Sequence, residues 1–154
     1  MSPADAPSGA GSVDELAIDA RAAEIPRAAE WLERAGRDRA IPPEQVGRLD
    51  ICLHEALANI VDHSSGADRP LSVRLRLEIL GTGDSREALV TVSDLGKAFD
   101  PLSAAPRPRP ATLAEAVPGG LGLVMIRGFS DTQDYRRTDG ANHLTFGVRW
   151  TVAR

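Results

Sequence analysis

The chain has 154 residues, of which 42% are hydrophobic and 26% charged, and its formal net charge is −4. These values fit one globular domain with a single core and exclude a membrane-spanning protein, because no apolar run reaches the roughly 18 residues needed to cross a bilayer. Nucleic acid is not expected as a partner either, since the charge is acidic and two Trp, one Tyr and three Phe residues are too few to stack a row of bases.

Residues 1–12 are rich in Ala, Ser, Pro and Gly, which predicts a disordered tail before a single domain over residues 13–154. Cys52 is the only cysteine, so the chain forms no internal disulfide and no cysteine zinc site. A reducing compartment fits this composition, and we expect a cytoplasmic protein.

The elements of the first half are predicted from apolar periodicity. Weak alternation over 13–19 predicts a strand, and an apolar stripe from Pro26 to Gly36 predicts a helix with proline in its first turn. A second helix is expected from Glu44 to about His63. Clear alternation over 71–79 then predicts a half-buried strand.

The second half is predicted to complete a sheet. The expected elements are a partner strand over 88–93, a proline-rich lid-like loop over 99–118, a short helix over 121–129, and two strands over 131–137 and 143–152. This order predicts an α/β (α+β) two-layer sandwich, in which helices cover one face of a mixed, mostly antiparallel sheet.

The second helix carries a polar face opposite its apolar residues. Glu55, Asn59 and Asp62 share this face, and Glu55 and Asn59 are one turn apart, so their side chains can converge on one ligand. An amide oxygen suits Mg²⁺, which takes much of its coordination from substrate phosphates, and a carboxylate one turn away can deprotonate a hydroxyl. The alternative is a solvated helix face.

Asp94-Leu95-Gly96 follows the second strand of the expected hairpin. A carboxylate at a strand end can accept a hydrogen bond from an exocyclic amine such as that of adenine, and Gly96 lets the backbone approach a ring closely. The alternative is an ordinary turn, for which Asp and Gly are typical residues.

Gly119-Gly120-Leu121-Gly122-Leu123 precedes the short apolar helix. Backbone N–H groups and the positive end of the helix dipole suit a polyphosphate at such a position. The spacing matches neither the P-loop nor the dinucleotide pattern, and a structural helix start is the alternative.

The order of these three motifs resembles a known family. The segment 54–63 is similar to the N box of the GHKL (Bergerat-fold) ATPases, Asp94-Leu95-Gly96 to the G1 box, and residues 119–123 to the G2 box. Glu-Ala-x-x-Asn-x-x-x-His over 55–63 and Phe99-Asp100-Pro101 resemble the anti-sigma-factor serine/threonine-protein kinases within that superfamily.

The resemblance implies a Bergerat fold that binds ATP with Mg²⁺. In that family's terms, Glu55 would be the catalytic base, Asn59 would coordinate Mg²⁺, and Asp94 would bind the adenine amino group. The resemblance further implies nucleotide contacts at Asp62, Gly96, Phe99, Gly119, Gly120, Leu121, Gly122, Leu123 and Thr145.

The resemblance also implies partners. The phosphate acceptor would be a serine of an anti-sigma-factor antagonist, a STAS-type protein that competes with a sigma factor for the kinase, and the kinase would be a homodimer. Two alternatives remain open: a non-catalytic nucleotide-binding regulatory module, and a stand-alone histidine-kinase-like ATPase domain.

Overall fold

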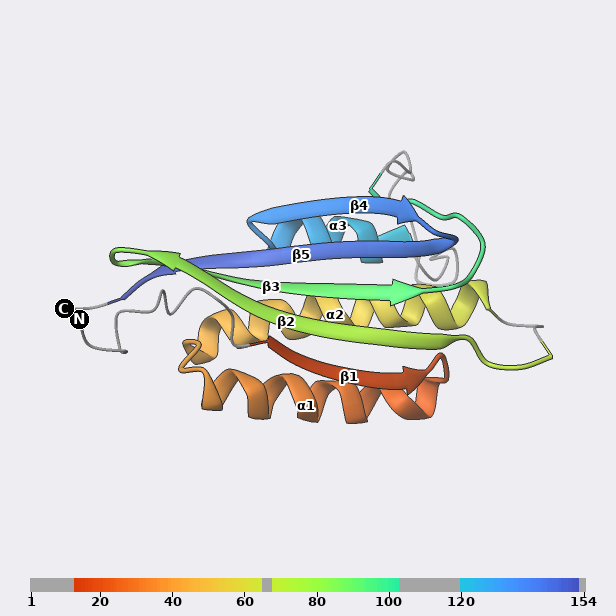
Figure 1. Ribbon diagram of the computed structural model, residues 1–154, viewed down its shortest axis with the longest axis horizontal. Helices are drawn as coiled ribbons and strands as arrows, with labels where there is room; N and C mark the ends of the chain where they lie inside the picture. The colour runs from red at the N-terminus through yellow and green to blue at the C-terminus, as the bar shows by residue number, and fades with distance from the viewer. Residues whose placement is uncertain (1–12, 65–67, 103–119, 153–154) are drawn as a thin grey trace, which may run out of the picture.

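The computed structural model describes residues 13–64, 68–102 and 120–152, with side chains from residue 125 onward in the last range. These residues form a five-stranded sheet in the order β1-β2-β3-β5-β4, with three helices packed along it (Figure 1). The elements are β1 (Val13–Asp19), η2 (Ala22–Glu24), α1 (Ile25–Asp38), α2 (Pro43–His63), β2 (Ser72–Thr82), β3 (Ser85–Asp94), α3 (Gly120–Phe129), β4 (Thr132–Thr138) and β5 (Ala141–Thr151).

The predicted two-layer α+β sandwich is confirmed. Every pairing among the described strands is antiparallel, where a partly mixed sheet was expected. The strand β5 begins at Ala141, two residues earlier than predicted, so Asn142 belongs to the sheet and pairs with Asp94 of β3. The predicted tail and most of the predicted lid lie outside the described residues.

The strands are joined by tight hairpins whose residues suit left-handed backbone. Gly83 has φ +60° in the β2–β3 turn, and Asp139 and Gly140 have φ values of 52° and 77° in the β4–β5 turn. Two successive positive φ values are typical of the turn that matches the right-handed twist of a hairpin. These turns fix the register and therefore which side chains face the helices.

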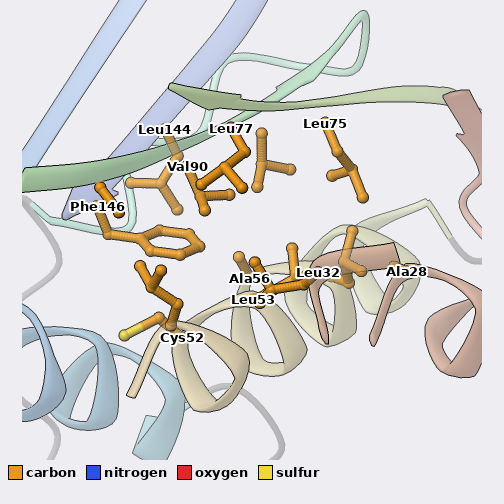
Figure 2. Close-up of a cluster of buried hydrophobic side chains, with 14 of the residues drawn as sticks. Ala28, Leu32, Cys52, Leu53, Ala56, Leu75, Leu77, Val90, Leu144 and Phe146 are labelled. Carbon is orange, nitrogen blue, oxygen red and sulfur yellow. The ribbon is translucent and has the colours of Figure 1, made fainter. Parts of the chain in front are cut away.

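The core lies between the sheet and α2. Alternate residues of β2 and β3 are fully buried, and they face the apolar stripe of α2 that includes Leu49 and Leu53. Phe146 of β5 is 0% exposed and points at α2 beside Cys52 (Figure 2). Burying each such large side chain contributes about 1.5–3 kcal/mol, so this layer supplies most of the stabilisation.

The opposite face of the sheet is lined by polar side chains that alternate with the core residues. Thr91, Ser93 and His143 line a groove there together with charged residues of β1 and β2. No helix covers this face in the described residues (Figure 1). None of the described helices is long and apolar enough to cross a membrane.

Candidate functional site

A pocket lies where β3 ends and β5 begins, between the second half of α2 and the loop that follows β3. Its volume is about 250 Å³, below the range of roughly 300–1,000 Å³ that is typical of a whole-ligand site. The described residues therefore form a compartment for one part of a ligand. Its walls are mainly apolar, and they include Ala56, Ile60, Leu71, Val92 and Leu144.

Asn59 brings an amide of α2 to this pocket. The residue is 8% exposed and lines the cavity, and its side chain has no hydrogen-bond partner among the described residues. Among the described residues no buried side-chain nitrogen or oxygen lacks a hydrogen-bond partner, so the Asn59 amide opens into the cavity, where a ligand or water can complete its hydrogen bonds. Glu55, one turn earlier, is half-buried and borders the pocket residue Ala56, whereas Asp62 is exposed and does not line the cavity.

Asp94 supplies a carboxylate at the end of β3, with only 9% of the residue exposed. The Gly96 N–H donates to Asp94 Oδ1 at 2.8 Å, and Asn142 Nδ2 donates to the same oxygen at 3.1 Å. Because both bonds end on Oδ1, the second oxygen remains available to a donor in the pocket.

A side chain at Gly96 would crowd two neighbouring side chains. A Cβ atom there would lie 2.7 Å from Asp94 Oδ1 and 2.8 Å from Leu71 Cδ1. The absence of a side chain lets the loop fold back over the carboxylate and pass close to the cavity, as the sequence predicts.

Phe99 and His63 form one side of the pocket. Their ring centroids are 4.1 Å apart with an interplanar angle of 44°, and both residues line the cavity. Phe99 remains 37% exposed. This contact joins the end of α2 to the loop after β3 and provides an aromatic edge for a flat ligand.

Two pocket residues, Asn142 and Tyr135, were not predicted from the sequence. Asn142 is 6% exposed, lines the cavity and bonds to Asp94. Its signal was present in the sequence, because it is an amide in phase with the buried residues Leu144 and Phe146 of the same strand. Tyr135 pairs with Leu144 across β4 and β5 and donates to Asn142.

Thr145 does not join the site. It lies on the open face of the sheet, where its hydroxyl forms a 2.9 Å hydrogen bond with the hydroxyl of Thr91. Alternation along β5 places Thr145 opposite to Leu144 and Phe146, which face the helices, and it is not among the residues that line the pocket.

The glycine-rich segment is described only in part. Gly119 lies outside the described residues, while Gly120, Leu121, Gly122 and Leu123 form the first turn of α3, so a helix does begin where it was predicted. This first turn lies at the end of the sheet where β3 ends (Figure 1). The rest of α3 packs on α2, where the thiol of Cys52 donates to the carbonyl of Ile126 at 3.8 Å.

Cys52 lies in the core and does not line the pocket. Burial raises the pKa of the Cys52 thiol to about 11, so this cysteine is no nucleophile at neutral pH. In the described ranges, no group of three or more His, Cys, Asp or Glu side chains is arranged to hold a metal ion.

Comparison with known proteins identifies the class of this architecture. A family model described as the histidine kinase-like ATPase domain matches residues 18–148, a range that contains Asn59, Asp94 and Asn142. The chain belongs to this ATPase family, as its resemblance to the GHKL superfamily implies.

A curated relative narrows the class to a kinase. The serine/threonine-protein kinase BtrW of Bordetella bronchiseptica is 37% identical over 133 residues, which cover 86% of this chain and 90% of the relative. The predicted enzyme class, a serine/threonine-protein kinase, is thereby confirmed.

Two solved structures agree in fold. A Mycobacterium tuberculosis structure with RsbU and RsbW domains superposes with a TM-score of 0.59 at 14% identity, covering 90% of this chain and 34% of that chain. The Pseudomonas aeruginosa SiaB–SiaC complex gives 0.56 at 15% identity, with 88% of this chain and 89% of that chain covered. At such identities the likeness shows the fold alone.

Proposed function

We propose that this kinase binds ATP with Mg²⁺ in the pocket beside Asp94 and transfers the γ-phosphoryl group to a serine of an anti-sigma-factor antagonist. The observation that carries the proposal is the meeting of two buried polar side chains, the Asp94 carboxylate and the Asn59 amide, in one cavity whose walls are mainly apolar. Each has hydrogen-bonding capacity left for a ligand.

The Asp94 end of the cavity suits adenine. The 6-amino group of adenine is a donor, and Asp94 Oδ2 is an acceptor left over by the two bonds to Oδ1. The purine would lie between the apolar side chains of α2 and those of the sheet, with Phe99 at its edge. Guanine carries an oxygen in place of the amine and would meet the carboxylate as a second acceptor.

The Asn59 side of the cavity suits the phosphates and a hard cation. The Asn59 amide lines the cavity and would present a neutral oxygen of the kind that Mg²⁺ accepts, and such an ion takes most of its other oxygens from phosphates and water. When bound, Mg²⁺ would neutralise charge that develops on the phosphates. The backbone N–H groups around Gly120 and Gly122 would bind the phosphate oxygens.

Glu55 is the proposed general base. It lies one turn of α2 before Asn59 and is half-buried, so its carboxylate would approach the phosphates from the same helix. During transfer, the serine Oγ would form its bond to the γ-phosphorus while ADP leaves, and Glu55 would take the hydroxyl proton.

The proposed regulatory role concerns partners. The kinase would phosphorylate a STAS-type antagonist and, when the antagonist is phosphorylated, hold a sigma factor in the cytoplasm. This assignment draws on the kinase relative and on the fold shared with SiaB, which was solved as a complex with SiaC. The kinase would also form a homodimer.

The decisive test compares the native protein with Glu55→Gln, using γ-labelled ATP, Mg²⁺ and purified candidate antagonists. We expect native protein to give an acid-stable phosphoserine product, and Glu55→Gln to slow transfer by about 10²- to 10⁴-fold. The ADP dissociation constant of the variant, measured by calorimetry, should change less than about threefold, because the base acts in transfer rather than in binding.

Other outcomes would redirect the assignment. An acid-labile product would indicate transfer to histidine, as expected of a histidine-kinase-like ATPase domain. ADP binding without transfer to any candidate would favour a non-catalytic regulatory module. Equal transfer rates for native protein and Glu55→Gln would remove Glu55 from the catalytic role.

A further inference from the structure

All hydrogen-bonding positions of the Asn142 side chain are taken by other groups of the protein. Its Nδ2 donates to Asp94 Oδ1 at 3.1 Å and to the carbonyl of Lys97 at 2.8 Å. Its Oδ1 accepts from the Phe99 N–H at 3.3 Å and from the Tyr135 hydroxyl. A primary amide offers two donors and one oxygen with two lone pairs, so nothing is left over for a ligand.

These four bonds tie three segments together. Asp94 is the last residue of β3, Lys97 and Phe99 belong to the loop behind it, and Tyr135 lies in β4. The bond between Asn142 and Asp94 is buried and the other three are part-buried. A satisfied network around a buried amide restrains its surroundings, because a broken bond would leave the amide without a partner in a low-dielectric setting. Asn142 is therefore placed to hold the shape of the wall behind Asp94.

The orientation of the Asp94 carboxylate depends on this wall. The terminal torsion of an aspartate is broad, so an unrestrained carboxylate samples many orientations. Here Gly96 and Asn142 both donate to Oδ1, which fixes the plane of the carboxylate and leaves Oδ2 as the oxygen that a ligand can reach.

We propose that Asn142 is the positioning residue that sets the preference of the pocket for adenine over guanine, an inference that rests on the proposed nucleotide binding. With its carboxylate fixed, Asp94 offers an acceptor where adenine has an amine and guanine an oxygen. If the carboxylate is free to rotate, it can turn away from the guanine oxygen, and the two bases become more nearly equal.

Two substitutions separate the contributions of the four hydrogen bonds of the Asn142 side chain. Asn142→Asp keeps the acceptor that serves Phe99 and Tyr135, but it removes both donors and places a second carboxylate against Asp94. Tyr135→Phe removes one donor and leaves the bonds from Asn142 to Asp94 and Lys97 in place. His143→Ala is the matched control, since His143 is the next residue of β5 and bonds to Ser93 on the open face.

The measurement is the ratio of the dissociation constants for GDP and ADP, obtained by calorimetry with Mg²⁺ on the full chain. We expect a ratio of about 100 or more for the native protein. Asn142→Asp should weaken the binding of ADP by about 10- to 100-fold and change the binding of GDP little. Tyr135→Phe should lower the ratio of the two dissociation constants about two- to fivefold. His143→Ala should keep the native ratio.

A merely structural role would lower the melting temperature without moving this ratio. If Asn142→Asp folds and keeps the native ratio of the GDP and ADP dissociation constants, the inference is overturned and the proposed function stays intact. If the native protein binds neither nucleotide, the proposed function itself is removed. If Asn142→Asp gives no cooperative thermal transition, Tyr135→Phe decides: a lowered ratio supports the inference and an unchanged ratio overturns it.

Discussion

The two faces of the sheet carry similar hydrogen-bonded pairs with different surroundings. On the covered face, Asn142 donates to Asp94 at 3.1 Å, and both residues are at most 9% exposed. One residue along the same two strands, Ser93 and His143 form a 2.7 Å hydrogen bond on the open face, where both are only partly buried. The strands and the register are the same for both pairs.

The comparison teaches that burial, more than residue type, distinguishes the site. A polar pair in a cavity binds its ligand with little competition from water, so the orientation of the pair affects the affinity for the ligand. A pair on an open sheet face exchanges its bonds with solvent at small net cost. The phase of each strand therefore decides which polar residues contribute to binding.

The largest contrast between the faces should appear in stability. Phe146→Ala removes a fully buried ring from the covered face and should lower the free energy of unfolding by about 3–5 kcal/mol. Thr145→Ala, one residue earlier on the open face, should cost less than about 1 kcal/mol. Urea denaturation measures both. Thr145→Ala should also keep the native affinity for ADP. A tenfold loss of that affinity would show that Thr145 contributes to nucleotide binding.

The next contrast concerns affinity. Asp94→Asn removes the charged acceptor from the covered face and should weaken ADP binding by about 10- to 100-fold. Ser93→Ala, its neighbour in β3, should leave the dissociation constant unchanged. Calorimetric titration of both variants checks this, and equal affinities for the two would contradict the assignment of the base site to the covered face.

The smallest effect concerns a link between the helix layer and the sheet. Asp131 accepts from Arg48 of α2 at 3.2 Å and from the Arg149 N–H of β5 at 2.8 Å. Burial opposes ionisation, but the bonds from the Arg149 N–H and from Arg48, together with the nearby charges, hold the pKa of Asp131 below its ordinary 3.8.

A group whose pKa is lowered by folding stabilises the fold at pH values above its unfolded pKa, and this contribution is lost as the pH falls through the folded value. Asp131→Asn should therefore cost less than about 1 kcal/mol at neutral pH, because solvent screens this partly exposed pair. The difference from native protein should vanish as the pH is lowered below 3.8. Urea midpoints against pH measure it, and a difference that persists in acid would exclude the charge as its cause.

The sequence was sufficient to predict most of the sheet and the helices. Alternation in β2 and β5 and the apolar stripe of α2 are local patterns, and the structure matches them within a few residues. The all-antiparallel pairing was not predictable in the same way, because it depends on which strands meet across long intervals of chain.

The site was predictable where a motif and a position in the fold agreed. Asn59 and Asp94 lie on separate elements, and the structure brings both to one pocket. Thr145 was assigned by resemblance against the alternation of its own strand, and the alternation proved to be the better guide. Asn142 was missed because the predicted strand began at residue 143, two residues after the observed start at Ala141, so an amide in phase with the core was not recognised as buried.

The two outer strands of the described sheet, β1 and β4, leave backbone groups unpaired along their free edges. Such edges invite other chains to add as strands and to build aggregates. Asp14, Glu15 and Asp19 make β1 acidic, and Asp14 is held by Arg39 at 3.0 Å, while β4 carries Asp134 and two arginines. Charge at both margins protects the protein against stacking edge to edge at high concentration.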